Sequence, residues 1–232
     1  MTQALVVGAS SDIGCSVAVE LAGCGFDVRL WGRDESRLAH TERLCREVGS
    51  ATWSVVDVCD DAQVEAGLQD VQARGPLGAV VYAAGVFDWA PADEADPAAW
   101  ERVIRVNLTA AAVLARLALP ALLRAAPSAL VFLGSAAGHR TFAHNAAYVA
   151  SKHGLVALAR ATFLDVRDRD VKVSVISPGL VAAGNGLRTE AGSSRPQELL
   201  SPSDVAAAVR FVVTFPMRGC PTEIHLEPQQ TP

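Results

Sequence analysis

Residues 4–24 of the chain read ALVVGASSDIGCSVAVELAGC. Residues 4–7 form a short apolar segment typical of a buried strand, residues 8–14 form a glycine-containing turn, and residues 16–24 are expected to be helical. In open α/β sheets, a strand, a glycine turn and a helix in this order bind a dinucleotide pyrophosphate with backbone N–H groups and the helix N-terminus. The stretch therefore predicts an α/β fold with a dinucleotide site at its first turn.

The same alternation of apolar and helical segments continues along the chain. Further strands are predicted at residues 27–31, 51–56, 77–83, 130–133, 171–176 and 223–226. Further helices are predicted at 35–48, 61–73, 97–119 and 202–215, and another helix carries Tyr148 and Lys152 and runs to about residue 166. Pro120 is expected to kink or interrupt the long helix that precedes it. Seven strands alternating with six helices predict a doubly wound, seven-stranded parallel sheet with helices on both faces, the Rossmann fold.

Length and composition favour one domain over residues 1–232, because half of the 232 residues are hydrophobic and one sizeable core can form. Residues 182–201 are rich in Gly, Ser and charge without apolar periodicity, which indicates a mobile lid. The net charge of −5 argues against a nucleic-acid partner or an anionic membrane surface. No uninterrupted apolar run reaches the ~18 residues of a membrane span, and no basic leader precedes the first strand.

The cysteines are odd in number and lack the paired spacing of metal ligands, so neither a disulfide framework nor a metal site is predicted. Reduced, mostly buried thiols are expected, and with them a cytoplasmic protein. The five cysteines are Cys15, Cys24, Cys45, Cys59 and Cys220.

A second stretch, residues 129–152, reads ALVFLGSAAGHRTFAHNAAYVASK. Its predicted strand ends near Ser135, and Tyr148 and Lys152 are four residues apart, so they share one face of the following helix. A phenol with a pKa of about 10 is a poor acid or base at neutral pH, but a neighbouring ammonium favours the phenolate and lowers that pKa. These residues therefore predict proton transfer to or from a substrate oxygen by Tyr148.

The residues after the second strand bear on which dinucleotide binds. Arg33 suits a ribose 2′-phosphate, whereas Asp34 could accept from a free 2′-hydroxyl. Asp34 also precedes a helical segment, where Asp is a preferred N-cap, while Arg33 has no such structural role. NADP(H) is therefore favoured over NAD(H).

With these residues assembled, the chain resembles the short-chain dehydrogenase/reductase family from end to end. The matching pieces are VGASSDIG at 7–14, Asp57-Val58, Ala83-Ala84-Gly85, Asn107, Ser135, YVASK at 148–152 and SPG at 177–179. The resemblance implies that Tyr148 is the general acid or base, that Lys152 holds the nicotinamide ribose and lowers the Tyr148 pKa, that Ser135 polarises the substrate carbonyl, and that Asn107 binds a water in a proton relay. It implies cofactor contacts from Gly8, Ser10, Ser11, Asp12, Ile13, Gly14, Arg33, Asp57, Val58, Ala84, Gly85, Asn107, Tyr148, Lys152, Pro178, Gly179 and Val181.

Three positions depart from the family pattern. Asp12 replaces a glycine in the first turn, and its carboxylate is expected to cap the helix N-terminus, away from the pyrophosphate. Tyr82 replaces the Asn that usually opens the fourth-strand motif, so the structure that this amide braces must be braced otherwise. Ala183 replaces a Thr that often bonds the nicotinamide carboxamide.

The sequence does not decide which residues line the substrate pocket. Two groups either line the pocket or lie in solvated loops: His139, Arg140, Phe142 and His144, and Phe87, Asp88 and Trp89. Arg188 and Arg195 in the lid either meet an anionic substrate or are exposed charges. The expected partner is a small-molecule carbonyl or alcohol, and the resemblance implies a homodimer or homotetramer joined through the long helix and the catalytic helix.

The predicted function is hydride transfer between NADP(H) and a ketone or secondary alcohol. One alternative is the reduction of a 3-oxoacyl group on a carrier protein, which would need a basic docking surface that the sequence does not show. Another is a non-catalytic dinucleotide-binding redox sensor, which would have no use for an intact Asn, Ser, Tyr and Lys set.

Overall fold

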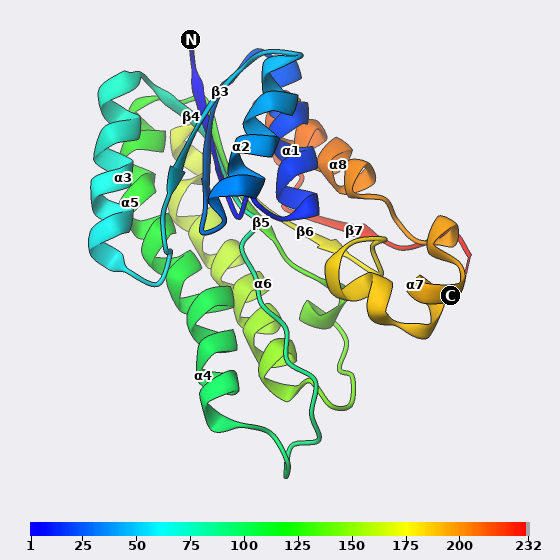
Figure 1. Ribbon diagram of the computed structural model, residues 1–232. Helices are drawn as coiled ribbons and strands as arrows, with labels where there is room; N and C mark the ends of the chain where they lie inside the picture. The colour runs from blue at the N-terminus through cyan, green and yellow to red at the C-terminus, as the bar shows by residue number, and fades with distance from the viewer. Residues whose placement is uncertain (231–232) are drawn as a thin grey trace.

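The computed structural model describes residues 1–230, and one seven-stranded sheet organises them (Figure 1). Its strands are β1 (Gln3–Val7), β2 (Asp27–Gly32), β3 (Ser50–Val55), β4 (Leu77–Tyr82), β5 (Ser128–Leu133), β6 (Val171–Pro178) and β7 (Glu223–Leu226). They lie in the order β3-β2-β1-β4-β5-β6-β7, with every neighbouring pair parallel. The predicted doubly wound parallel sheet is therefore confirmed, and its strand order reverses between β1 and β4.

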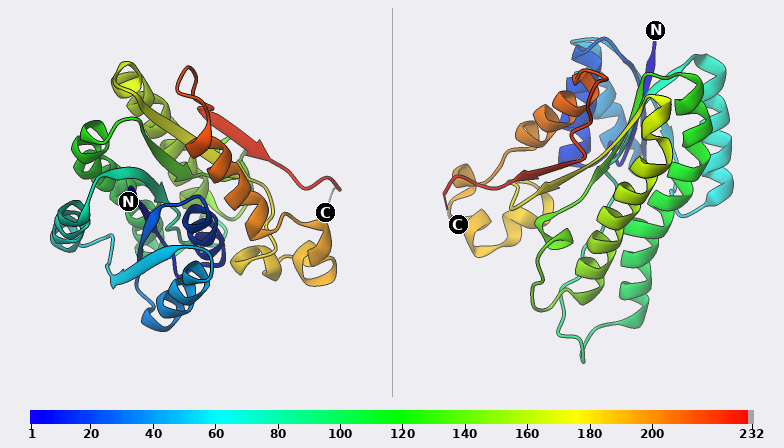
Figure 2. Two further views of the ribbon diagram at one scale, coloured as in Figure 1. Left: turned by 90° about the horizontal axis from the view of Figure 1, so that it is seen from above. Right: turned by 180° about the vertical axis from the view of Figure 1, so that it is seen from behind.

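Helices cover both faces of the sheet (Figure 2). One face carries α1 (Asp12–Gly23), α2 (Glu35–Arg46) and α8 (Pro202–Thr214), and the other carries α3 (Asp61–Arg74), α5 (Ala110–Arg124) and α6 (Ala146–Val166). In β1, Ala4 and Val6 belong to the core under α1 and α8, whereas Leu5 and Val7 belong to the core under α3 and α5. Successive side chains of a strand point to opposite faces, so one fully apolar strand supplies both cores.

The predicted helix after β4 is longer than expected and changes its geometry midway. It begins as α4 (Pro97–Ile104), passes through a π-helical turn, η1 (Arg105–Thr109), and continues as α5. Of the two predicted effects of Pro120, a kink or an interruption, the interruption does not occur, because α5 runs through Pro120 to Arg124. Proline removes one backbone hydrogen bond, but Ala121 and Leu122 just beyond it are buried in the core, and this burial holds the last turn in place.

The continuous helix from Pro97 to Arg124 passes a test for a membrane span by length and composition, although half of its most apolar 18-residue window is buried inside the protein. That burial places it among core helices, and such a helix by itself is weak support for a membrane span.

The segment from residue 182 to 201 contains three short helical pieces, η4 (Gly184–Arg188), α7 (Glu190–Ser194) and η5 (Pro196–Glu198). Its two ends are joined by the bridge between Val181 and Leu200. The backbone N–H of Ala182 donates to the Leu200 carbonyl at 2.7 Å. The segment therefore projects from the body as a closed excursion beside the carboxyl edge of the sheet (Figure 1).

Candidate active site

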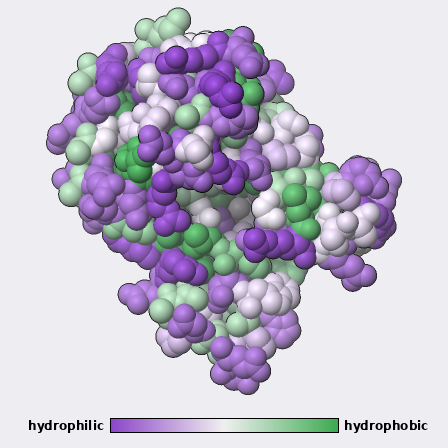
Figure 3. Space-filling view, in the orientation of Figure 1, coloured by the Kyte–Doolittle hydropathy of each residue, from purple (hydrophilic) through white to green (hydrophobic). Residues whose placement is uncertain are grey.

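The predicted site residues follow the carboxyl ends of different strands, and a parallel sheet places those ends along one edge. Gly8 follows β1, Arg33 follows β2, Asp57 lies beyond β3, Gly85 follows β4 and Ser135 follows β5. On this side the surface is hollowed between α1 and α2 above, α6 below and α7 to the right (Figure 3). A different cavity, of about 460 Å³, lies at the opposite edge of the sheet near Thr2 and Lys172, and none of the predicted site residues line it.

The first turn is compact because two glycines permit close backbone contacts. Gly8 has φ +88°, and a Cβ there would lie 2.6 Å from the Ala84 nitrogen. A Cβ on Gly14 would lie 2.1 Å from the Gly8 oxygen. Ser11 caps α1 by accepting from the Gly14 N–H at 3.0 Å. Any side chain at either glycine would push the helix N-terminus away from β1 and β4.

The turn leaves backbone donors free for a ligand. Within residues 1–230, the N–H groups of Ser10, Asp12 and Ile13 have no hydrogen-bond partner in the protein. Unpaired N–H groups at a helix N-terminus are suited to bind an anion. The residues of this turn therefore fit a dinucleotide pyrophosphate.

Asp12 does not cap the helix, so that prediction is wrong. Helix α1 begins at Asp12 itself, and the preceding residue Ser11 takes the cap position. The Asp12 carboxylate instead accepts from Arg37 of α2 at 2.5 Å, and both side chains are about half exposed. Its charge still lies in the first turn of the helix, where the macrodipole favours an anion.

Asp34 caps α2, as its position predicts. Its Oδ1 accepts from the backbone N–H of Arg37 at 3.0 Å and from the Ser36 hydroxyl at 2.8 Å. These bonds, the backbone one first, hold the pKa of the Asp34 carboxyl below its usual value. Arg33 is exposed at the end of β2, and within residues 1–230 it forms no ion pair. Of the two neighbours, Arg33 is the one whose charge is available to a ligand.

Asp57 and Val58 form the turn after β3. Asp57 is half-buried, and its Oδ1 accepts from the Cys59 N–H at 2.9 Å. Val58 is buried, with 9% of its surface exposed. This bond holds the carboxylate of Asp57 at the carboxyl edge of the sheet.

The turn after β6 faces the same edge. Pro178 ends β6, and the Gly179 N–H donates to the Leu226 carbonyl of β7 at 2.7 Å. Val181 is buried at the base of the projecting segment. Ala183 packs its methyl group against the core under α1 and α8, and it offers no side-chain hydrogen bond.

Asn107 lies in the π-helical turn and is fully buried. Its Oδ1 accepts from the Val86 N–H at 2.8 Å, and its Nδ2 donates to the Val86 carbonyl at 2.9 Å. Nδ2 also donates to the Ser151 hydroxyl at 3.1 Å. Ser151 in turn donates to the Tyr148 carbonyl at 2.7 Å. Asn107 therefore joins the loop after β4 to the helix that carries Tyr148.

Ser151 is a site residue that sequence reasoning missed. It is fully buried, and it connects Asn107 to α6. The available signal was a hydroxyl on α6 one residue before Lys152, three after Tyr148. Without the position of η1, nothing in the sequence indicates which partner this hydroxyl meets.

Tyr82 braces the π-helical turn. It is the last residue of β4, it is fully buried, and its hydroxyl donates to the Val106 carbonyl at 2.6 Å. Burial raises the pKa of Tyr82, so the phenol stays protonated and remains a donor. Since Val106 directly precedes Asn107, Tyr82 replaces the missing amide with a longer side chain that reaches across to the helix.

Ser135, Tyr148 and Lys152 come together at the end of β5. The Lys152 Nζ donates to the Leu133 carbonyl at 2.8 Å and lies 5.7 Å from the centre of the Tyr148 ring. The Ser135 Oγ accepts from the Ala137 N–H at 3.1 Å, which leaves its own O–H free to donate. A Cβ built on Gly85 would lie 3.5 Å from the Asn107 Oδ1 and 3.8 Å from the Lys152 Nζ. The four predicted catalytic residues thus lie together near the carboxyl ends of β4 and β5.

The expected lowering of the Tyr148 pKa is not observed. Burial raises the pKa of the Tyr148 phenol, and the Ser135 hydroxyl beside it acts in the opposite direction. Burial also lowers the pKa of Lys152 to about 8. The Lys152 ammonium donates to the Leu133 carbonyl and has little effect on the pKa of the Tyr148 phenol. Desolvation therefore accounts for most of the pKa change at both residues.

Aromatic side chains border the Tyr148 ring. Phe87 meets Tyr148 edge to face with centroids 4.8 Å apart, and it stacks on Trp89 at 6.0 Å. Trp89 lies 5.6 Å from the ring of His144. The Ala90 N–H donates to the His144 carbonyl at 2.7 Å and ties the two loops together.

The remaining residues of these loops point elsewhere. His139 contacts Ser177 with its Nε2 at 3.1 Å, and Arg140 pairs with Glu227. His139 therefore lies against β6, and Arg140 lies against the residue that follows β7. Phe142 is 47% exposed. In the projecting segment, Arg195 pairs with Glu198 at 3.0 Å, which favours an exposed structural charge there.

Comparison with known proteins identifies the family. The family model for short chain dehydrogenases matches residues 2–192. The chain belongs to the short-chain dehydrogenase family. An uncharacterized oxidoreductase of Staphylococcus saprophyticus is 29% identical over 228 residues, which cover 97% of this chain and 96% of that protein.

Two solved structures of this family are close to the whole chain. A metagenomic short-chain oxidoreductase in complex with NADP has a TM-score of 0.86 and 29% identity, and the match covers 99% of this chain and 98% of that one. An actinorhodin polyketide ketoreductase with NADPH has a TM-score of 0.89 and 26% identity, covering 97% and 95%. This short-chain dehydrogenase is therefore an oxidoreductase that acts on CH–OH or C=O groups with a dinucleotide cofactor.

Proposed function

We propose that this short-chain dehydrogenase reduces the ketone of a small molecule with NADPH, using Tyr148 as the general acid. The observation that carries the proposal is the convergence of Asn107, Ser135, Tyr148 and Lys152 beside the free backbone donors of the first turn. Such a constellation would supply a proton donor and a hydrogen-bond donor for the substrate oxygen beside a bound dinucleotide.

The chemistry of the site divides between cofactor and protein. The bound nicotinamide supplies the hydride that reaches the carbonyl carbon. Tyr148 donates its phenolic proton to the carbonyl oxygen, and Ser135 donates a hydrogen bond to the same oxygen, so the product is the neutral alcohol. In the reverse reaction Tyr148 removes that proton. Burial holds the phenol protonated, which supports the reductive direction.

Lys152 and Asn107 complete the proposed machinery. Lys152 would hold the nicotinamide ribose and return a proton to Tyr148 after turnover. Asn107 would hold a water that links Lys152 to solvent. The Asn107 Oδ1 and the Lys152 Nζ, both near Gly85, support this pairing.

NADP(H) is proposed over NAD(H). The exposed Arg33 at the end of β2 and the use of Asp34 as a helix cap support this choice. A guanidinium is suited to a 2′-phosphate, while the Asp34 carboxylate already accepts two hydrogen bonds through its Oδ1 as the cap of α2. The two close structures that contain NADP or NADPH support it as well. The other contacts would come from the residues after β1, β3, β4 and β6 described above.

The substrate would lie between the loop after β4, which carries Phe87 and Trp89, and the projecting segment. Phe87 and Trp89 would form its apolar wall beside Tyr148, and residues 182–201 would close over it as a lid. The likeness to a polyketide ketoreductase favours one alternative, a 3-oxoacyl thioester on a carrier protein.

We further propose that this single-domain protein forms a homodimer or homotetramer in the cytoplasm. Helix α6 exposes Leu164, which is 64% accessible, and its neighbour Phe163 is only partly buried. The apolar helix from Pro97 to Arg124 has half of its most apolar window uncovered. A second copy could cover these faces, and the five free cysteines agree with a reducing compartment.

The test measures binding and turnover separately. Affinities of NADPH and NADH are measured by fluorescence titration for the wild type and for Tyr148→Phe. Oxidation of each cofactor is then followed with a panel of ketones and 3-oxoacyl thioesters. Tyr148→Phe removes one hydroxyl and keeps the ring against Phe87, so it separates chemistry from packing.

NADPH consumption that disappears in Tyr148→Phe while binding survives would support the reductase. Turnover confined to carrier-bound thioesters would select the 3-oxoacyl alternative. Tight dinucleotide binding with no turnover on any carbonyl would instead indicate a redox sensor.

A further inference from the structure

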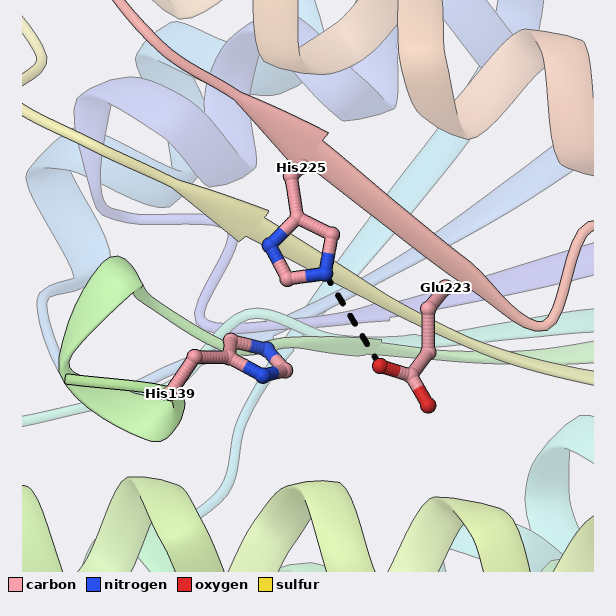
Figure 4. Close-up of side chains that lie close together, drawn as sticks. All are labelled: His139, Glu223 and His225. Carbon is pink, nitrogen blue, oxygen red and sulfur yellow. Dashed lines mark ion pairs between the residues drawn. The ribbon is translucent and has the colours of Figure 1, made fainter.

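Three potential metal ligands converge beside the edge strand β7, outside the proposed catalytic set. His139 follows the short turn after Ser135, while Glu223 and His225 lie on β7. Figure 4 shows the three side chains pointing toward one another from these two elements. One ligand atom from each lies within 4.8 Å of the others. The ring centres of His139 and His225 are 4.2 Å apart, and the His225 Nε2 is 3.8 Å from the Glu223 Oε2.

The donor set suits zinc. Two imidazoles and one carboxylate are a known set of three protein ligands for Zn²⁺, with a fourth position left to water. Zinc bonds of about 2.0–2.1 Å place tetrahedral ligand atoms roughly 3.3 Å apart. The widest gap here therefore has to close by roughly 1.5 Å. His225 is 52% exposed and Glu223 is 23% exposed, so rotation of exposed side chains can supply that movement.

The surroundings of His139 hold its ring in place. Its Nε2 is 3.1 Å from the Ser177 hydroxyl, and such an outer contact orients a ligating imidazole.

Arg160 of α6 is the competitor for this site. Its guanidinium holds Glu223 through Nε at 2.5 Å and Nη2 at 3.0 Å. A bidentate pair of this kind occupies both carboxylate oxygens, and its positive charge opposes a nearby cation. A metal must therefore displace at least one guanidinium contact from Glu223.

We propose that His139, Glu223 and His225 form a Zn²⁺ site that joins β7 to the loop after β5, and that Arg160 occupies the Glu223 carboxylate when zinc is absent. Strand β7 has only four residues and pairs with β6 alone. The loop after β5 begins at Gly134 and contains both Ser135 and His139. Zinc would thus clamp an edge strand to the loop that leads from the proposed active site, and it would raise the melting temperature of the protein.

The test uses the full chain, freed of metal with a chelator and then dialysed. Isothermal titration with zinc chloride measures affinity and stoichiometry, and Co²⁺ absorption reports the ligands. Binding of one Zn²⁺ per chain is expected, with His139→Ala and His225→Ala each weakening it at least about tenfold. Arg160→Ala should tighten binding, because it releases Glu223. His40→Ala is the matched control, since His40 is exposed on α2 beside Arg43, and it should change nothing.

His225→Ala keeps the test decisive if His139→Ala fails to fold, because His225 is half exposed. Absence of saturable zinc binding would overturn the proposal. Binding that survives both histidine substitutions, or that weakens in Arg160→Ala, would do the same. A sulfur-to-cobalt charge-transfer band would place the metal on a cysteine and would also overturn it.

Discussion

Replacement of each of the two tyrosines by phenylalanine is expected to act mainly on stability at Tyr82 and mainly on turnover at Tyr148. Tyr82→Phe removes the hydroxyl that donates to the Val106 carbonyl at 2.6 Å inside the core, while the ring keeps its packing. An unsatisfied buried acceptor costs about 1–3 kcal/mol. For a protein of this size, that loss lowers the melting temperature by roughly 3–10 °C.

Activity should fall as well, because Val106 precedes Asn107 in the π-helical turn. A turn that is less firmly held would misplace the Asn107 amide relative to Val86 and Ser151. We expect kcat to fall by about tenfold or less and the affinity for NADPH to stay near that of the wild type, since a displacement near the chemistry acts mainly on turnover. Urea unfolding followed by circular dichroism gives the stability change, and NADPH oxidation gives kcat.

Tyr148→Phe is the matched control. Burial raises the pKa of that phenol, and its ring contacts Phe87. It should therefore unfold within about 1 kcal/mol of the wild type while turnover falls by about 10²-fold or more. The reasoning would be refuted if Tyr82→Phe unfolded at the wild-type urea concentration, or if the two variants exchanged their effects.

Three further changes test the charges of the site. Burial lowers the pKa of Lys152 to about 8 from 10.5, so between these pH values the unfolded chain binds more protons than the folded one, and wild-type stability should rise with pH by up to about 3 kcal/mol. Lys152→Met should remove that rise in urea titrations across the same pH window. An unchanged dependence of stability on pH would contradict the lowered pKa. Arg33→Ala should lower the NADPH affinity by about tenfold or more relative to NADH, whereas Asp34→Ala should lower stability, because it removes the cap of α2, without changing the ratio of the two affinities. Equal affinity ratios in the wild type and both variants would reject Arg33 as the residue that selects NADPH. Asp12→Gly should change NADPH affinity by less than about tenfold, because the Asp12 carboxylate is paired with Arg37 at the surface and the loss of such a pair changes stability little. A hundredfold gain in affinity would show that the carboxylate repels the pyrophosphate.

Local patterns were sufficient for the fold, and the family resemblance supplied most of the candidate site residues. Apolar segments of strand length alternating with helical ones predicted the parallel sheet, and its geometry places the carboxyl ends of the strands at one edge. That geometry explains why Gly8, Gly85 and Ser135, which follow three different strands, lie at the same edge. Tyr148 and Lys152 share a helix face by spacing alone, and Asp34 is a cap by position.

The errors have a common physical cause. Asp12 pairs with Arg37 on another helix. Pro120 is tolerated inside α5 because the turn beyond it is buried. At Tyr148, desolvation has a larger effect on the phenol pKa than the neighbouring ammonium. Each outcome depends on what another element places beside the residue. Propensity and spacing describe only the neighbours along the chain.

Periodicity and local backbone sterics define the layered α/β architecture and the glycine turn, and the spacing of Tyr148 and Lys152 on one helix face indicates proton transfer. Packing between elements brings Tyr82 to the π-helical turn of Asn107, connects that turn to α6 through Ser151, and brings His139 to β7. These contacts join residues 24 to 86 positions apart, and packing between elements, rather than spacing along the chain, brings such residues together.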